Sequence, residues 1–437
     1  MNILKNEGPR AEKDTDTEKL DKERSIFGKH IDKRKKIIKN KNVLQTSYLP
    51  DVLPHRSNDI DKIAEIIASA FDGDRPSNIM IFGKTGTGKT AVMNFIGNEL
   101  KKEDPQGSSC VYIYINCEVV DTKYSTLQNI GNQIIDDFEK RIPFTGWGID
   151  KVYSEMRNSI DEQNKVFVVV LDEIDKLVSK SGDDVLYQLT KINEDLKHSK
   201  LSLIGISNNL NFTEFLDPRV KSRLSEEKMI FHQYDAQQLT DILRNRARFA
   251  FEDGGLEEGV IPLCAAMSAQ EMGDARMALD LLRIAAETAE RNGETTVAEA
   301  HVKSAKNKIE LDTVSETVKM LTKQSKTVLM SVIHNTKEKN KTMTTGEVYS
   351  TYGDLCDILG ITSLTQRRVT DLISELDMLG IVHARTISLG RHGRTKKIEL
   401  SIPKEICDML EDDENMKLIK NYRSPKQQRL PFNEDNR

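Results

Sequence analysis

The sequence has few cysteines and no long apolar run. Its five cysteines form no CxxC pair, so the spacing predicts neither a zinc site nor a disulfide framework. No stretch of about eighteen apolar residues occurs, which excludes a membrane-spanning helix and a membrane partner. The charged first residues, 1–23, contain no apolar signal core, which argues against secretion. We therefore expect a cytoplasmic chain whose thiols are reduced and buried.

An excess of positive charge is also missing. The formal net charge is −5, so the total does not indicate a nucleic-acid-binding protein. The charge is nevertheless uneven, because residues 22–41 and 385–397 are rich in lysine and arginine, whereas residues 411–414 are all acidic. A local basic face matters more for DNA than the total charge, so these two segments stay candidates for DNA contact.

The chain is long enough for several domains, since 437 residues exceed one hydrophobic core. Residues 1–24 are polar and predict a disordered tail. Residues 25–235 contain four short apolar runs without strict alternation, separated by helical patterns such as 59–71 and 91–100. The runs span residues 79–82, 111–115, 166–171 and 201–206. This alternation predicts an α/β domain built on a buried parallel sheet.

The rest of the chain changes pattern twice. Residues 236–312 carry no strand pattern and predict a helical lid, with an alanine-rich helix from about 274 to 291. Residues 315–410 show helical segments followed by strands at 382–388 and 396–401, which is typical of a winged helix. Residues 411–437 form an acidic, polar tail.

A phosphate-binding loop follows the first apolar run. The string GKTGTGKT matches GxxxxGK[ST] and lies between a predicted strand and a predicted helix. Backbone N–H groups of such a loop surround phosphates, and the helix start adds a positive dipole end. Lys89 is placed to reach the β and γ phosphates, and Thr90 to ligate Mg²⁺. The loop residues are Gly83, Lys84, Thr85, Gly86, Thr87, Gly88, Lys89 and Thr90.

Polar residues end two further apolar runs. Asp172 and Glu173 follow the run at 166–171, and Asn208 follows the run at 201–206. Ligands bind at the carboxyl ends of strands in open α/β sheets. We expect Asp172 to hold the Mg²⁺ shell and Glu173 to orient and deprotonate the attacking water, while Asn208 contacts the γ-phosphate or that water. The structural alternatives are a helix cap for the acidic pair and a turn for Asn208.

Three arginines are candidate nucleotide sensors. Arg219 and Arg223 follow the last strand, where an arginine finger of one subunit can reach the γ-phosphate of a neighbour. Arg276 lies in the first turn of the alanine-rich helix, which the helix dipole makes a poor place for a cation. A cation tolerated there suggests that its guanidinium meets an anion. Ordinary surface arginines are the alternative.

The last domain offers a candidate DNA-binding face. Ser363 to Gln366 fits a capping box, and Val369, Leu372, Ile373, Leu376 and Leu379 form the apolar side of the helix before Gly380. The polar front at its start carries Gln366, Arg367 and Arg368, and recognition helices enter a major groove with that end. A glycine-bounded turn with Arg391 and Arg394 suits phosphates or a minor groove. A winged helix used for protein contacts is the alternative.

Taken together, these strings resemble the archaeal origin-recognition and cell-division-control (Orc/Cdc) initiator ATPases. The resemblance covers about residues 25–406 and is carried most specifically by YLPDVLPHR at 48–56 and GDAR at 273–276. It implies an AAA+ P-loop ATPase core with a helical lid, followed by a winged helix. It further implies ATP or ADP with Mg²⁺, slow regulatory hydrolysis, origin duplex DNA, a replicative helicase and a second initiator copy as partners, and a nucleoid location.

The resemblance also assigns individual roles. It makes Lys89, Thr90, Asp172 and Glu173 the ATP and Mg²⁺ residues, Asn208 the first sensor and Arg276 the second. It makes Arg223 the finger acting in trans, with Arg219 as the alternative. Leu53 and Arg56 would lie beside the adenine. Residues 119–160 are similar to a helical insert that such initiators use to touch DNA.

Other functions remain open at this stage. An ATP-gated winged-helix transcription regulator or a signalling ATPase would carry the same two modules, and a transposition helper ATPase would coat DNA without sequence preference. The lysine run at 33–41 is a weaker candidate for DNA contact. The string QQRLPF at 427–432 is similar to a sliding-clamp-binding peptide, although chance explains it better.

Overall fold

The protein folds into two compact units, Met1–Ala305 and Lys306–Arg437, which are described separately. The computed structural model describes residues 36–135, 137–339, 342–388 and 394–422. The expected disordered tail at 1–24, most of the basic segment at 22–41 and the QQRLPF string lie outside these residues. Among the described residues, no helix is both long and apolar enough to cross a membrane.

The first unit is built on a parallel sheet of five strands in the order β2-β3-β4-β1-β5. Four of the strands were expected from the apolar runs. The fifth, β5, was missed because it lies at the sheet edge and buries only Phe231 fully, so its sequence contains no continuous apolar run. The strands are β1 (Ile79–Gly83), β2 (Cys110–Asn116), β3 (Val166–Asp172), β4 (Lys200–Ser207) and β5 (Glu227–Phe231).

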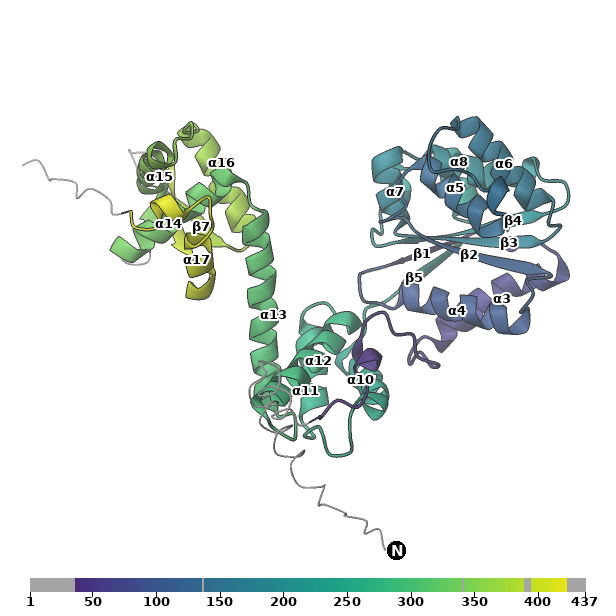
Figure 1. Cartoon of the computed structure of the whole chain (residues 1–437), viewed down its shortest axis with the longest axis horizontal. Coiled ribbons are helices and arrows are strands. Elements are labelled where there is room, and N and C mark those ends of the chain that lie inside the picture. Colours follow the sequence, from purple (N-terminus) through teal and green to yellow (C-terminus); the bar gives the residue numbers. More distant parts are fainter. Residues whose placement is uncertain (1–35, 136, 340–341, 389–393, 423–437) are drawn as a thin grey trace, which may run out of the picture. The chain divides into compact units, whose positions relative to one another are not determined.

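Both faces of this sheet are covered by helices. Along β3, Phe167, Val169 and Leu171 face one core, while Val166, Val168 and Val170 face the other. Helices α5 to α8 cover the first face and α3 and α4 the second, as Figure 1 shows. This double burial explains why the central strands read as continuous apolar runs rather than alternating ones.

The helices of this sheet domain fall between the strands, as the sequence pattern predicts. They are α3 (Ser57–Ala68), α4 (Lys89–Glu103), α5 (Lys123–Ile134), α6 (Ile149–Asp161), α7 (Ile174–Ser181), α8 (Asp184–Lys191) and α9 (Pro218–Leu224). Short 3₁₀ segments are η1 (Lys41–Leu44), η2 (Ser69–Asp72), η3 (Phe138–Lys140), η4 (Ile192–Glu194) and η5 (Phe212–Phe215).

A helical lid follows the sheet, as expected. It contains α10 (Ala236–Ala250), α11 (Val260–Gln270), α12 (Ala275–Asn292) and the start of α13 (Glu299–Met320). Helix α12 begins at the cap Asp274 and ends at Gly293, whose φ of 78° is the left-handed conformation that glycine adopts easily. Ala278, Ala285, Ala286 and Ala289 of α12 are buried, which lets the lid helices pack closely.

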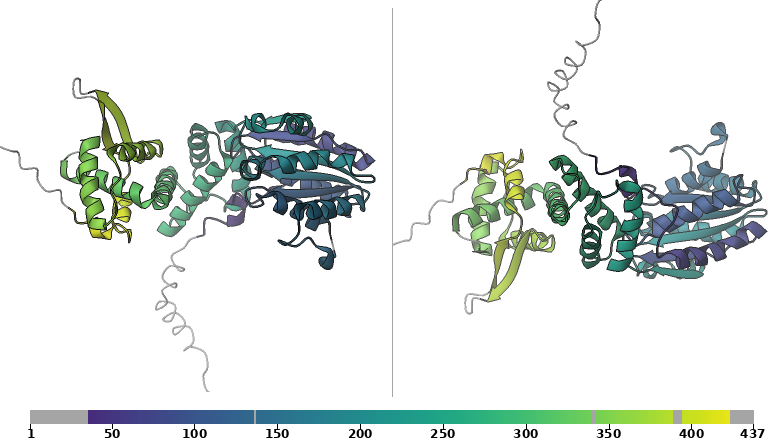
Figure 2. Two further views of the ribbon diagram at one scale, coloured as in Figure 1. Left: turned by 90° about the horizontal axis from the view of Figure 1, so that it is seen from above. Right: turned by 90° about the horizontal axis from the view of Figure 1, so that it is seen from below.

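The second unit has its own apolar core and a three-stranded sheet of order β6-β8-β7. Figure 2 shows the β7–β8 hairpin extending beyond the helices of this unit. The short strand β6 was not expected. The elements are α14 (Lys323–Lys339), β6 (Met343–Thr344), α15 (Thr345–Leu359), α16 (Gln366–Met378), β7 (Val382–Ser388), β8 (Arg394–Leu400), α17 (Lys404–Glu411) and η7 (Lys417–Ile419).

Helix α16 matches the expected recognition helix with two corrections. Its cap is Thr365, whose hydroxyl accepts from the Arg368 N–H, so Ser363 does not form the capping box proposed from the sequence. Val369, Leu372, Ile373 and Leu376 are buried, but Leu379 is 50% exposed because the helix ends before it. The fold class, a P-loop ATPase core with a helical lid followed by a winged helix, is confirmed.

Two helix glycines predict opposite effects of the same substitution. A Cβ at Gly97 of α4 would lie 2.5 Å from Cε1 of Tyr112, whereas one at Gly353 of α15 meets nothing within 4 Å. We expect Gly97→Ala to lower the free energy of unfolding by about 1–3 kcal/mol through overpacking. Gly353→Ala should raise it by about 0.4–1 kcal/mol, because alanine loses less backbone entropy. Urea unfolding of both variants measures this, and a stabilising Gly97→Ala would contradict the packing of α4 on β2.

Candidate nucleotide site and nucleic-acid interface

One cavity of the first unit brings together most of the predicted nucleotide residues. It is lined by the P-loop, the ends of β3 and β4, residues 46–56 and the lid. Of the predicted residues, its lining contains Leu53, Arg56, Thr85, Gly86, Gly88, Lys89, Thr90, Asp172, Glu173, Asn208 and Arg276. Gly83, Lys84 and Thr87 are not part of the lining.

The P-loop is shaped by two glycines and one threonine. Gly86 and Gly88 have φ values of 72° and 86°, which side chains with a Cβ rarely adopt. A Cβ at Gly88 would also lie 2.7 Å from the Tyr234 hydroxyl. The Thr87 hydroxyl donates to the Lys84 carbonyl at 2.8 Å, which closes the loop on itself. Helix α4 starts directly after this loop, so its first N–H groups point at the cavity.

Lys89 is buried at the centre of the site. Its ammonium donates to the carbonyls of Gly83 at 2.8 Å and Lys84 at 2.7 Å, and to the Asn208 side-chain oxygen at 2.8 Å. The pKa of Lys89 is lowered to about 8, mainly by burial; the charge of Asp172 opposes this shift and that of Arg276 adds to it. The ammonium is therefore desolvated and stabilised mainly by backbone carbonyls, which suits an incoming phosphate.

Oxygen atoms suited to a hard cation meet beside Lys89. The Thr90 hydroxyl donates to Asp172 Oδ2 at 2.7 Å, and the Tyr114 hydroxyl donates to the same oxygen at 2.7 Å. Asp172 is buried with a relative exposure of 4%, and its second oxygen accepts the Glu173 N–H at 2.9 Å. Hydroxyl and carboxylate oxygens are what Mg²⁺ prefers, so the donor set fits this ion. Tyr114 is a residue that the sequence analysis missed, because nothing in the β2 run distinguishes it.

Glu173 lies next to this pair in an unusual backbone conformation. Its φ of 55° is left-handed, and it precedes the first residue of α7. Strained non-glycine residues of this kind gather at functional sites. Burial raises the pKa of Glu173, and the carboxylates of Glu118, Asp172 and Asp175 raise it further. A carboxylate with a raised pKa is a better proton acceptor than an ordinary one.

The lid contributes the start of α12 to the cavity. The Ala275 N–H donates to the Gly86 carbonyl at 3.2 Å, so the lid touches the P-loop directly. Asp274 caps α12 by accepting the Arg276 N–H at 2.7 Å. Within the described part of the chain, the Arg276 guanidinium makes no hydrogen bond or ion pair, although its charge lowers the pKa of Lys89. It lines the cavity as the sequence analysis expected.

Arg56 and Leu53 line the same cavity, but the Arg56 guanidinium is already engaged. It donates to the Tyr234 hydroxyl at 2.9 Å, to the His232 carbonyl at 2.7 Å and to Asp59 at 3.0 Å. It also lies 4.3 Å from the centre of the Tyr234 ring. The Arg56 guanidinium therefore connects residues 46–56 to the residues that follow β5. Tyr234 was missed, although its place just before the capping box of α10 is a signal that could have found it.

The two candidate finger arginines do not line the cavity. On α9, Arg219 forms a two-pronged contact with Asp217, both distances being 3.1 Å, and is 70% exposed. Arg223 pairs with Glu194 at 2.8 Å and is 41% exposed. Neither arginine lines the nucleotide cavity of its own chain, so a role in trans stays a prediction beside the alternative of ordinary surface arginines.

The second unit presents the predicted DNA-binding residues at the start of α16. Gln366, Arg367 and Arg368 are exposed, and Arg368 lies 3.5 Å from Glu375. Arg394 is the first residue of β8, paired with Ser388 of β7. Arg391 lies outside the described residues. On β7, Arg385 contacts His383 at 2.7 Å, and Lys396 of β8 contacts Ser374 of α16, so basic side chains also lie on the hairpin.

The segment at 119–160, expected as a DNA-touching insert, is mostly part of the sheet domain. Leu127 and Ile130 of α5 and Val152 and Met156 of α6 are buried in the first core. The loop between the helices carries Phe144, which is 86% exposed. Contact of this loop with DNA stays a prediction. All five cysteines of the chain are buried and free, as expected.

Three family models match successive parts of this chain. The family described as AAA domain matches residues 73–212, the Cdc6 AAA+ ATPase-type lid domain matches residues 240–307, and the CDC6 C-terminal winged helix domain matches residues 316–409. The chain is 53% identical over 383 residues to the ORC1-type DNA replication protein 1 of Methanosarcina mazei, which covers 87% of this chain and 91% of that protein.

Two further likenesses extend over similar lengths. The ORC1-type DNA replication protein of Thermococcus onnurineus is 48% identical over 408 residues, which is 93% of this chain and 98% of that protein. Among solved structures, the Aeropyrum pernix ORC1 protein in complex with DNA has a TM-score of 0.74 and 41% sequence identity, covering 88% of this chain and 99% of the other.

The lowered pKa of Lys89 predicts how nucleotide affinity depends on pH. A phosphate binds the ammonium form, which the nucleotide-free site loses as the pH rises through about 8. ATP affinity should therefore fall above pH 8, by up to about tenfold per pH unit, and binding should take up a proton there. In Lys89→Arg, whatever its absolute affinity, the charge persists at high pH, so its affinity should stay level. Calorimetric titrations from pH 7 to 9.5 measure this, and a level wild-type profile would contradict it.

Proposed function

The chain belongs to the family of ORC1-type DNA replication proteins and is an AAA+ ATPase, and from this premise we propose that it is a DNA replication initiator switched by ATP. In this proposal the winged-helix unit binds duplex DNA at origin repeats, and the nucleotide controls the contacts made to DNA and to the replicative helicase. In this proposal the lid spans residues 236–312 and the winged helix residues 315–410.

The observation that carries the proposal is that one chain holds both a cavity lined by P-loop residues and an acidic pair, and an exposed basic helix start. The P-loop, Asp172, Glu173, Asn208 and Arg276 line one cavity. The second unit exposes Arg367 and Arg368 at the first turn of α16. An ATPase motor without a DNA-reading module, or a winged helix without a nucleotide site, would lack one of these two parts.

The residues of the cavity divide the chemistry among them. Lys89 and the P-loop N–H groups bind the β and γ phosphates, and Asn208, already hydrogen-bonded to Lys89, positions the γ-phosphate or the attacking water. Glu173 orients this water and accepts its proton, which the raised pKa of its carboxyl favours. Arg276, free within the described residues, stabilises phosphate charge from the lid side.

The Mg²⁺ ion of this proposal would be held by Thr90 and Asp172, whose oxygen atoms already lie 2.7 Å apart. When bound, the ion supplies charge neutralisation for the phosphate oxygens. Arg223, or Arg219 in its place, would act in trans on the nucleotide of a second initiator copy. Slow hydrolysis follows from this arrangement, because one chain by itself lacks the finger that accelerates phosphoryl transfer.

The separate roles of Lys89 and Glu173 predict separate defects. Lys89→Ala should abolish nucleotide binding, since it removes the ammonium on which the site converges. Glu173→Gln keeps the shape but removes the proton acceptor, so it should keep ATP affinity and lower turnover by about 10² or more. Equilibrium binding and single-turnover hydrolysis separate the two effects. A Glu173→Gln protein that hydrolyses ATP at the wild-type rate would contradict the role of Glu173 as proton acceptor.

The basic start of α16 predicts a loss of base-specific affinity. In the full-length chain, Arg367→Ala should cost roughly 1–3 kcal/mol on the preferred duplex and much less on random DNA. Lys404→Ala, an exposed charge at the start of α17, is the matched control and should change neither value. Genome-wide mapping of the bound sites gives the biological test, since the proposal expects few sites beside an origin rather than many promoters.

Replacing Arg391 and Arg394 should have a different effect on DNA affinity, because phosphate contacts carry no sequence information. Their joint replacement by alanine should weaken every duplex alike. It should also reduce the log–log dependence on salt by about 0.9 per lost contact. If the full chain shows no salt-dependent binding to any duplex, the winged helix is a protein-contact module and the origin-binding proposal fails.

A further inference from the structure

One wall of the nucleotide cavity is formed by the second half of residues 36–56, a segment here called the strap. Nine of its residues, all between Thr46 and Arg56, line the cavity. Several are apolar, including Leu49, Pro50 and Leu53, which suits the face of a base more than a phosphate. Since Lys89 and Thr90 take the phosphate side, the strap lies where the base belongs. In Figure 1 the strap is the purple segment that passes from the lid helices to α3.

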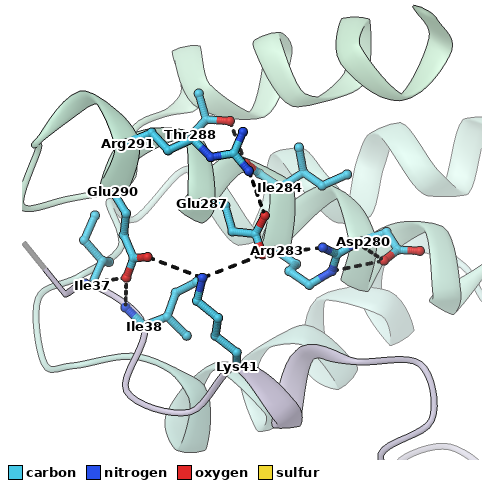
Figure 3. Close-up of polar contacts among 10 residues, drawn as sticks. All are labelled: Ile37, Ile38, Lys41, Asp280, Arg283, Ile284, Glu287, Thr288, Glu290 and Arg291. Atoms are coloured by element: carbon cyan, nitrogen blue, oxygen red, sulfur yellow. Dashed lines mark hydrogen bonds and ion pairs between the residues drawn. The ribbon is translucent and has the colours of Figure 1, made fainter. Parts of the chain in front are cut away.

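The first end of the strap is bound to the lid by a buried carboxylate. Glu290 of α12 accepts the N–H groups of Ile37 at 3.0 Å and Ile38 at 2.9 Å, and it lies 3.6 Å from the Lys41 ammonium. Figure 3 shows the carboxylate pointing at these two backbone groups. Glu290 has a relative exposure of only 7%. A buried charge needs such partners, so release of the strap would leave this carboxylate unsatisfied.

Backbone bonds and apolar burial strengthen the same attachment. The N–H groups of Lys39 and Asn40 both donate to the Ala250 carbonyl at the end of α10, at 2.8 and 3.1 Å. Ile37, Ile38, Val43 and Leu44 are buried. The strap is therefore part of the lid fold up to Leu44, although the sequence separates it from the lid by about two hundred residues.

Arg246 of α10 holds the middle of the strap. Its guanidinium donates to the Tyr48 carbonyl at 2.9 Å and to the Val43 carbonyl at 3.3 Å, and lies 4.8 Å from the centre of the Tyr48 ring. Arg246 is itself buried and lines the cavity. One planar guanidinium thus binds two carbonyls, one on each side of the bend between η1 and the cavity wall. The single ammonium of a lysine could not bridge them in the same way.

The other end of the strap is fixed to the sheet domain through Arg56, as described above. The strap thus runs between two attachment points, one on the lid and one on the sheet, and forms the base-side wall between them. Any shift of the lid relative to the sheet must change the shape of this wall.

We propose that Arg246 is a positioning residue for the base of the bound nucleotide, acting through the strap, and that Glu290 anchors the strap for the same purpose. The proposal rests on nucleotide binding in this cavity. Both guanidinium hydrogen bonds of Arg246 run to strap carbonyls, so we assign its effect on the base to the strap. Its loss should weaken recognition of the base while leaving the phosphate site intact.

The experiment compares ligands with and without a base. Affinities for ATP, ADP and inorganic tripolyphosphate are measured on the full chain carrying Arg246→Ala or Glu290→Ala. Each variant should bind ATP and ADP about tenfold or more weakly, roughly the effect of one lost hydrogen bond to a charged group. Tripolyphosphate affinity should be unchanged. Turnover at saturating ATP should also be unchanged, since Glu173 and Lys89 are untouched.

Each variant has a matched control on its own helix. Arg244→Ala removes an exposed arginine whose ion pair with Asp241 spans 4.0 Å, and Asp280→Ala removes a carboxylate of α12 that pairs with Arg283 of the same helix at 2.8 Å. Surface pairs contribute little, so both controls should bind all three ligands like the wild type. Hydrogen exchange of residues 37–48 gives a direct second measurement. Nucleotide should slow exchange there in the wild type and in neither strap variant.

The outcomes separate this proposal from the function on which it rests. A wild-type chain that binds neither ATP nor ADP would overturn the proposed function itself. If the wild type binds ATP and Arg246→Ala binds it with the same affinity, only the proposed role of the strap is overturned. Equal losses for ATP and tripolyphosphate would overturn it too, because they would show a disturbed phosphate site rather than a misplaced base wall.

Discussion

A single buried ammonium group joins the elements from which the nucleotide site is assembled. Lys89 starts α4, and its Nζ donates to carbonyls at the end of β1 and to Asn208 just after β4. These strands are neighbours in a parallel sheet, so their carboxyl ends meet at one edge, and β3 brings Asp172 to the same edge. The remaining polar groups of the cavity are arranged around this one charge. Its lowered pKa reflects a site that is desolvated before any phosphate arrives.

The sequence could predict those parts of the nucleotide site that are formed by a few consecutive residues. The P-loop, Asp172 with Glu173, and Asn208 each follow a buried strand, and a buried parallel strand is visible as an apolar run. Strand β5 was not predicted because an edge strand buries one face only in part. Leu379 was wrongly assigned to the buried face because α16 ends before it. Arg246 could not be found, since its partners Val43 and Tyr48 lie about 200 residues away in the sequence.

The start of α12 shows how a cation is tolerated in a first helical turn. Asp274 accepts the N–H groups of Arg276 and Met277, so the positive end of the helix dipole is already countered. The same turn touches the P-loop through the Ala275 N–H. A Cβ at Gly86 would lie only 1.8 Å from the Asp274 carboxylate, so glycine is required there by the lid as well as by its φ. Phosphate loop and lid are therefore fitted to each other at the point where Arg276 enters the cavity.

The lid thus meets the nucleotide cavity from two sides, and the two contacts differ in kind. At α12 the contact to the P-loop is one backbone hydrogen bond of 3.2 Å, which a small lid movement can break at little cost. At the strap the contact is a buried carboxylate, a buried guanidinium and four buried apolar side chains, all of which would be costly to separate. A moving lid would therefore release the P-loop first and carry the base-side wall with it. Since Arg56 holds the far end of that wall on the sheet, the strain falls on residues 45–55, most of which line the cavity.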